Sequence, residues 1–229
     1  MIIPPYAELQ KQLEAIDITK TLTEKEKSEL LKSLKFIYYK RGETIYKQGR
    51  PINEISILMS GLAKISIEND RQDKTTIISI QGPISFLGTA TLFEDVYGAT
   101  SEAMNDAIVA IIDKKAMLQI LNSNAKFATA MLKINSKTIK RCMRQIADFG
   151  QKQIKARIAC VIWAISDLVQ SDFIDIQISR NELADYAGIS TGSAIRLLSD
   201  LEKAGVVVLD KKTIDIKNKE ELIKIALTD

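Results

Sequence analysis

One short segment carries side chains whose types and spacing suit hydrogen bonding to a nucleic acid. It opens with the small residues Thr191, Gly192 and Ser193, and Arg196 follows one helical turn later. In a helix, residues three and four apart share a face, so the hydroxyl groups and the guanidinium would lie together where the helix has little bulk. Such a helix is suited to entering the DNA major groove. We therefore expect Thr191, Ser193 and Arg196 to contact DNA.

The residues around this segment predict two helices joined by a tight turn. Ser179 and Glu182 have the spacing of a capping box at the start of the first helix. Gly188 can adopt the left-handed conformation that ends a helix, and Ser190 is a second N-cap residue. The second helix is expected from Thr191 to about Ala204. Its buried stripe consists of Ala194, Leu197, Leu198 and Leu201.

A β-hairpin signal follows the two helices. The β-branched run Val206–Leu209 precedes a polar turn at Asp210–Lys212, and Thr213–Ile216 alternates between polar and apolar residues. A helix–turn–helix followed by a two-stranded wing is a winged helix. The residues best placed for phosphate contacts are Ser190, Lys211 and Lys212. The alternative is a small α/β packing module without nucleic acid, but the agreement of caps, turn and wing favours DNA.

The composition is that of a globular protein, with 46% hydrophobic and 27% charged residues among 229. The net charge of +3 is only mildly basic, but nine basic residues face one acid, Asp148, between Lys126 and Arg157. This imbalance favours a polyanionic partner for the second half, although we expect the early lysines to lie on a solvated helix face. No run is long enough to span a membrane and no signal peptide is evident, so we expect a cytoplasmic protein without a membrane partner.

The scarcity of metal ligands excludes several chemistries. The chain has two cysteines, Cys142 and Cys160, and no histidine. It cannot by itself build a four-cysteine iron–sulfur cluster, an ordinary cysteine/histidine zinc site or a histidine-ligated haem. A Ser-His-Asp triad is excluded as well. We therefore expect no metal, no cofactor and no enzymatic activity.

The first half predicts short helices followed by a β-sheet domain. Pro4–Lys35 is expected to be helical, with Thr23 as a cap. Glycines then punctuate a run of short β-branched segments, which is typical of a sandwich or barrel-like roll. The expected strands are Thr44–Tyr46, Ile55–Leu58, Ala63–Ile67, Thr75–Ile80 and Ile108–Ile112, with Glu68–Asp73 as a polar hairpin loop.

One long helix is predicted from Asn124 to about Gln151. Apolar residues at spacings of three and four form a heptad seam that suits a two-stranded coiled coil. The seam consists of Leu132, Asn135, Ile139, Cys142, Ile146 and Phe149. A buried asparagine at such a seam can fix its register. Cys142 is expected to be a packed thiol, and the alternative is a redox switch in which it approaches its counterpart on the second chain. A second apolar face, with Phe127, could pack on the β-domain, and Phe149–Lys152 is a candidate hinge.

The strand region also carries family motifs. The segments Lys40–Ile45 and Ile55–Gly61 resemble the opening of a cyclic-nucleotide-binding β-roll, and Gly82–Gly88 resembles the approach to its phosphate cassette. With the winged helix behind them, the whole chain resembles the CRP/FNR superfamily of transcription regulators. The resemblance implies an α+β fold with an effector-sensing β-roll over residues 1–123, a dimerisation helix over 124–151 and a DNA-binding winged helix over 152–229. It also implies a homodimer that contacts RNA polymerase.

The resemblance identifies the positions of an effector pocket, but this sequence has no charged residues at those positions. The cyclic-AMP binders of the family use a glycine–glutamate pair and an arginine–serine pair, and these four positions correspond to Gly88, Thr89, Ala99 and Thr100. The two hydroxyl residues of the long helix that reach the adenine correspond to Cys142 and Met143. Without the arginine, a buried phosphate would lose a bidentate ionic contact. We expect that any small-molecule effector is not cyclic AMP bound in the family's manner.

Together these features predict a homodimeric regulator of transcription that binds a near-palindromic operator in double-stranded DNA. Arg196 matches the recognition-helix arginine of the family, whose guanidinium can bind guanine O6 and N7 together. Gly192 stands where the family often has a glutamate, so half-site preference cannot be transferred. The rival interpretation is a ligand-sensing module whose winged helix docks a protein partner. An enzyme is a distant third, since Glu94, Asp95 and Tyr97 are expected to be loop residues.

Overall fold

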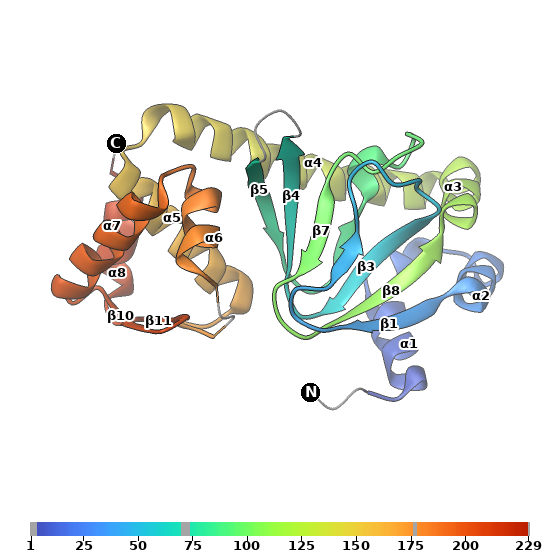
Figure 1. Cartoon of the computed structure of the whole chain (residues 1–229). Coiled ribbons are helices and arrows are strands. Elements are labelled where there is room, and N and C mark those ends of the chain that lie inside the picture. The colour runs from blue at the N-terminus through green and yellow to red at the C-terminus, as the bar shows by residue number, and fades with distance from the viewer. Residues whose placement is uncertain (1–3, 70–73, 176–177, 229) are drawn as a thin grey trace. The chain divides into compact units, whose positions relative to one another are not determined.

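The computed structural model describes residues 4–69, 74–175 and 178–228 (Figure 1). The chain divides into two compact units, one made of residues 1–65 and 81–141 and the other of residues 66–80 and 142–229. Within the described ranges, no helix combines the length and the apolar character that crossing a bilayer requires.

Two short helices open the first unit, as predicted. They are α1 (Tyr6–Ala15) and α2 (Glu24–Ser33), with a 3₁₀ turn, η1 (Thr19–Thr21), between them. The Thr23 hydroxyl accepts from the Glu26 N–H, and the Glu26 carboxylate accepts from the Thr23 N–H at 2.8 Å, which forms a capping box. The Asn124 side chain donates to Thr21 O at 3.0 Å and to Glu26 at 2.8 Å, so it ties this helical pair to the chain ahead of the long helix.

Two four-stranded sheets form the β-roll. The strands are β1 (Lys35–Tyr39), β2 (Thr44–Tyr46), β3 (Glu54–Ser60), β4 (Ala63–Asn69), β5 (Lys74–Gln81), β6 (Ser85–Leu87), β7 (Thr100–Ala103) and β8 (Ala107–Asp113). One sheet has the order β1-β8-β3-β6, with antiparallel pairs throughout, and the other has the order β2-β7-β4-β5. The roll therefore matches the predicted architecture.

Alternate residues of the first sheet bury one face against helices. Ile55 and Ile57 of β3 and Ile112 of β8 belong to one apolar cluster with Leu13 of α1 and Phe127 of the long helix. Residues two apart on a strand share a face, so this face is the one that the helices cover. The intervening residues Leu58, Val109 and Ile111 are also buried, which explains why β8 is a continuous apolar run and why β3 is interrupted only by the buried Ser56.

The predicted strands are confirmed within one or two residues, and three further strands appear in the roll: β1, β6 and β7. The sequence did not single these out, because β6 is short and β7 is largely polar. Of the predicted hairpin loop, Asp70–Asp73 lies outside the described residues.

The roll is followed by α3 (Lys114–Ser123) and the long helix α4 (Ala125–Gln151). Asp113 caps α3 by accepting from the Ala116 N–H at 2.9 Å. Phe127 and Met131 of α4 are buried in the apolar cluster of the first unit, as the second apolar face predicted. Gly150 lies inside the last turn of α4, so the helix break falls at Lys152 and Gln153, slightly later than the predicted hinge.

The second unit packs helices on a small sheet. It contains α5 (Ile154–Val169), β9 (Phe173–Ile174), α6 (Arg180–Ala187), α7 (Thr191–Lys203), β10 (Val207–Asp210), β11 (Thr213–Ile216) and α8 (Lys219–Ala226). The sheet order is β10-β11-β9, so the predicted two-stranded wing gains a third strand. The core face of α5 includes Ile158, Ile162 and Ile165, each nearly fully buried.

Candidate nucleic-acid interface

The turn between α6 and α7 is fixed by local hydrogen bonds. The Ser179 hydroxyl accepts from the Glu182 N–H at 3.1 Å, and the Glu182 carboxylate accepts from the Ser179 N–H at 2.8 Å. Gly188 ends α6 with φ +63°, and the Ile189 N–H then donates to Ala184 O at 3.0 Å. Because left-handed backbone costs glycine little, this geometry sets the angle between the two helices reproducibly.

The second helix of the motif, α7, has one buried and one open face. Its apolar residues Ala194, Leu197, Leu198 and Leu201 are buried. On the other side Arg196 is exposed, and no heavy atom lies within 4 Å of a side chain added at Gly192. The Ser190 hydroxyl accepts from the Ser193 N–H at 3.2 Å and donates to the Ser193 hydroxyl at 2.9 Å. The start of α7 is therefore a capped, narrow edge beside an exposed guanidinium.

A side-chain hydrogen bond joins the wing to α7. The Glu202 carboxylate of α7 accepts from the Leu209 N–H of β10 at 2.8 Å. The two-residue turn of the wing, Lys211 and Lys212, is exposed, and Lys211 has φ +46°. Two ammonium groups are thus presented at a tight turn with its orientation fixed relative to α7.

Arg180 is a half-buried cation of the helix–turn–helix that the sequence reasoning missed. It follows the N-cap residue of α6, where the helix dipole disfavours a cation, and this position is the signal that was available. One guanidinium nitrogen is buried and has no hydrogen-bond partner among the described residues. Burial lowers the pKa of Arg180, and the carboxylate of Glu202 partly offsets this. The unpaired nitrogen is enclosed by the protein, so it is not itself open to an anion in solvent.

The predicted hinge is held by Arg157 and Phe149. Arg157 Nε donates to Lys152 O at 3.2 Å, and its Nη1 donates to Gly188 O at 3.3 Å. The guanidinium also lies 5.9 Å from the centre of the Phe149 ring, and a side chain added at Gly188 would meet that ring at 3.5 Å. The end of α4, the start of α5 and the helix–turn–helix are therefore linked.

The six residues of the predicted heptad seam differ in exposure along α4. Leu132, Ile139 and Ile146 are 66%, 59% and 71% exposed, whereas Asn135, Cys142 and Phe149 are half-buried. Asn135 accepts a hydrogen bond from the Thr89 hydroxyl of the same chain at 3.2 Å. An apolar row remains uncovered on α4, and one polar member of the predicted seam has a partner within its own unit.

The expected effector positions in the roll carry no charge. Gly88 adopts φ +84° ahead of a 3₁₀ turn, η2 (Thr89–Thr91), and Ala99 is half-buried. Thr100 is buried and accepts from the Gln48 N–H at 3.1 Å. Further along α4, Cys142 is half-buried and Met143 is exposed. The predicted positions in the roll thus offer hydroxyl groups and backbone, with neither carboxylate nor guanidinium.

Two stacked tyrosine rings lie next to Gly88. The rings of Tyr46 and Tyr97 are 4.3 Å apart with an interplanar angle of 14°, and a side chain at Gly88 would meet Tyr97 at 3.1 Å. The Tyr97 hydroxyl donates to Glu54 O at 2.7 Å. Burial raises the pKa of Tyr97 to about 12 and raises that of Tyr46 further, so both rings stay neutral. Tyr97 lies in the loop between η2 and β7, as expected, and its side chain is buried there by packing.

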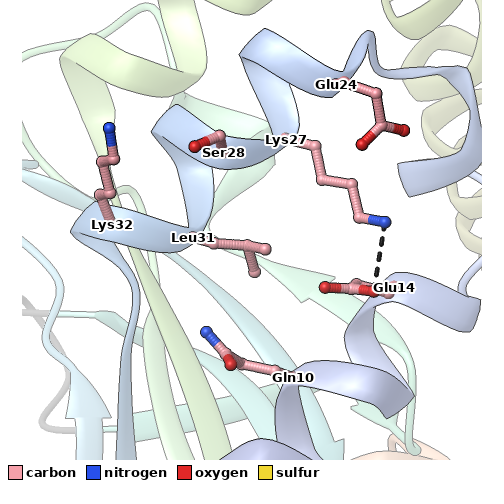
Figure 2. Close-up of a pocket in the computed structure, with 7 residues that line it drawn as sticks. All are labelled: Gln10, Glu14, Glu24, Lys27, Ser28, Leu31 and Lys32. Atoms are coloured by element: carbon pink, nitrogen blue, oxygen red, sulfur yellow. Dashed lines mark ion pairs between the residues drawn. The ribbon is translucent and has the colours of Figure 1, made fainter.

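A groove lies between α1 and α2, away from the predicted sites (Figure 2). Its volume is about 360 Å³, and Lys27 Nζ pairs with Glu14 across it at 3.1 Å. Glu24 and Lys32 also line it, so its charges balance and do not select an ion of either sign. In the part of the chain that the structure describes, no group of acidic or cysteine side chains could hold a metal ion.

Two families match successive parts of the chain. The family described as Cyclic nucleotide-binding domain matches residues 36–124, and the family described as Crp-like helix-turn-helix domain matches residues 156–225. Together the two matches span more than half of the chain, and they contain the roll and the α6–α7 motif respectively.

Known proteins of similar length align with both parts. The CRP-like cAMP-activated global transcriptional regulator of Mycobacterium tuberculosis is 20% identical over 203 residues, which cover 86% of this chain and 90% of the relative. The Anaerobic regulatory protein of Bacillus subtilis is 24% identical over 79% of this chain and 78% of the relative. These relatives are regulators and not enzymes.

The fold is also that of a solved regulator. The crystal structure of a putative transcriptional regulator of the crp/fnr family from Eubacterium rectale aligns with a TM-score of 0.78 and 16% identity, over 93% of this chain and 99% of that chain. The chain therefore belongs to the CRP/FNR superfamily of transcription regulators and carries that family's DNA-binding helix–turn–helix.

Proposed function

We propose that the protein is a homodimer that binds a near-palindromic operator and regulates transcription from it in the cytoplasm. The observation that carries this proposal is the open face of α7, where Arg196 is exposed beside a narrow capped edge. A guanidinium there can bind guanine O6 and N7 together, while Thr191 and Ser193 offer hydroxyl groups. Ser190, Lys211 and Lys212 are proposed to contact phosphate.

The dimer is proposed to form along α4. Leu132, Ile139 and Ile146 recur at spacings of seven and leave an apolar row exposed on one chain. A second α4 packed in parallel would cover that row, as in a two-stranded coiled coil. Two-fold symmetry would then place two recognition helices about one turn of DNA apart, roughly 34 Å, which favours a palindromic operator.

We propose that any effector of the roll is a molecule other than cyclic AMP. Thr89 and Ala99 provide no charge for a ribose hydroxyl or a phosphate, and the stacked pair Tyr46–Tyr97 already occupies space beside Gly88. A desolvated phosphate without an ionic partner is strongly disfavoured. No iron–sulfur cluster, zinc or haem is proposed, because the chain has two cysteines and no histidine. Contact with RNA polymerase remains an expectation from the family.

The test is selection of bound fragments from genomic DNA with the wild-type protein and the Arg196→Ala variant, followed by affinity measurement on the enriched site. Loss of a bidentate guanine contact should weaken operator binding by about 1–3 kcal/mol and relax the preference for that base pair. Arg50→Ala is the matched control, since Arg50 is an exposed arginine of the first unit. Unchanged operator binding by Arg196→Ala would refute the recognition-helix assignment. Absence of any bound duplex would favour a winged helix that docks a protein.

A further inference from the structure

A row of lysines follows one side of α4. Lys126, Lys133, Lys137 and Lys140 are all exposed, and they are separated by seven, four and three residues. At 3.6 residues per turn these spacings keep the four side chains on one face, which we call the lysine face. From Lys126 to Lys140 the helix rises about 21 Å at 1.5 Å per residue.

The lysine face has no neutralising partner in the described part of the chain. None of its four lysines forms an ion pair there. The one acid of α4, Asp148, lies two turns beyond Lys140 and is 3.9 Å from Lys152. Like charges three and four residues apart destabilise a helix. The row of lysines therefore destabilises α4, and no acidic side chain in the described part of the chain offsets this effect.

Neither packing nor dimerisation accounts for the lysine face. Phe127 and Met131 on another side of α4 are buried in the apolar cluster. The exposed apolar row, with Leu132 and Ile139, lies on a third side and is where a second copy would pack. Solubility alone does not require a row of lysines on the solvent-exposed side of a helix. Lysines that alternate with acidic residues would keep the helix soluble without repulsion between like charges.

We propose that the lysine face binds the phosphate backbone of double-stranded DNA without regard to sequence. Lysine acts as a compact point charge that suits phosphate, and it is depleted at protein–protein interfaces. Arg144 is also exposed and follows Lys140 by four residues, so a guanidinium, which can bind phosphate bidentately, extends the same face. Its length of about 21 Å corresponds to about six base pairs at 3.4 Å each. This surface is additional to the winged helix and does not depend on it.

The test uses the full-length protein and a duplex of random sequence, with affinity measured over a range of salt concentrations. The slope of log affinity against log salt concentration should become less steep by about 0.9 for each phosphate contact that is lost. The variant Lys133→Gln/Lys137→Gln/Lys140→Gln removes three contacts from each lysine face, so its slope should change by about 3 for each helix on the DNA. Glutamine keeps a helix propensity similar to that of lysine, and circular dichroism checks the fold. The control Lys11→Gln/Lys25→Gln/Lys35→Gln removes the same charge from exposed lysines elsewhere and should leave the slope nearly unchanged.

Equal slopes for the two triple variants would overturn the proposal, because the effect would then be one of net charge alone. Repeating the comparison in the Arg196→Ala background separates this surface from the recognition helix, and the difference in slope should persist there. If the lysine-face variant loses binding to vesicles of anionic phospholipid but keeps the wild-type slope on duplex, the partner is a membrane surface and the proposal is wrong.

Discussion

In the proposed dimer, replacing Ile139 by alanine should weaken the association of the two chains without disturbing the single chain. Ile139 is 59% exposed on α4, so little of its side chain contributes to the packing of its own unit. Full burial of an isoleucine side chain is worth about 1.5–3 kcal/mol, and covering the exposed part would contribute about 1–2 kcal/mol for each chain. The substitution removes this twice in a symmetric dimer, about 2–4 kcal/mol in all. The dimer Kd should then rise from about 30-fold to several hundred-fold.

Sedimentation equilibrium over a range of protein concentrations measures this Kd directly. Thermal unfolding at a concentration where both proteins are monomeric should show nearly the same midpoint for Ile139→Ala and wild type. Leu227→Ala is the matched control, since Leu227 is 56% exposed but follows α8 and does not belong to α4. An unchanged Kd for Ile139→Ala would refute the reasoning that a second α4 covers this row. A lower unfolding midpoint of the monomer would instead mean that Ile139 stabilises its own chain.

Two further predictions concern helix caps. Ser179→Ala removes the hydroxyl that accepts from the Glu182 N–H and should lower the free energy of unfolding by about 1 kcal/mol in denaturant titrations, whereas the exposed residue change Ser28→Ala should have little effect. The pKa of Glu26 is lowered below its usual 4.5 by the hydrogen bond from the Thr23 N–H and by that from Asn124. A lowered folded-state pKa means that ionised Glu26 stabilises the fold above pH 4.5 and that this stabilisation is lost as the pH falls through the folded-state pKa. The free energy of unfolding of the Glu26→Gln variant should therefore depend less on pH below pH 4.5 than that of the wild type. The same pH dependence in both proteins would contradict the assigned role of Glu26.

The parts of the fold that the sequence predicted are those set by neighbours in the chain. The capping box of Ser179 and Glu182 involves residues three apart, and the turn at Gly188 needs only a left-handed residue. The buried stripe of α7 and the long apolar runs of β3 and β8 follow from periodicity alone. These features are local, so propensity and pattern were enough to place them.

The features that sequence reasoning missed depend on residues far apart in the chain. Ser101 in β7 is polar yet fully buried, because its neighbours in the folded roll and not its own hydrophobicity decide its burial. Tyr97 is buried through its stack with Tyr46, which no spacing along the chain could reveal. Asn135 was assigned to the seam from its heptad position, while its contact with Thr89 joins residues 46 apart. For the helix–turn–helix, the position of Arg180 after the N-cap residue could be seen in the sequence, but the burial of its guanidinium nitrogen could not.

The contacts of Arg157 decide where this protein can bend. One guanidinium holds the carbonyls of Lys152 and Gly188 and lies over the ring of Phe149, which itself abuts Gly188. The helix break at Lys152 and Gln153 is therefore bridged on both sides by the same side chain. Within the second unit these contacts therefore tie the last turn of α4 to the turn between α6 and α7, and loss of the Arg157 side chain would remove the bridge across the helix break.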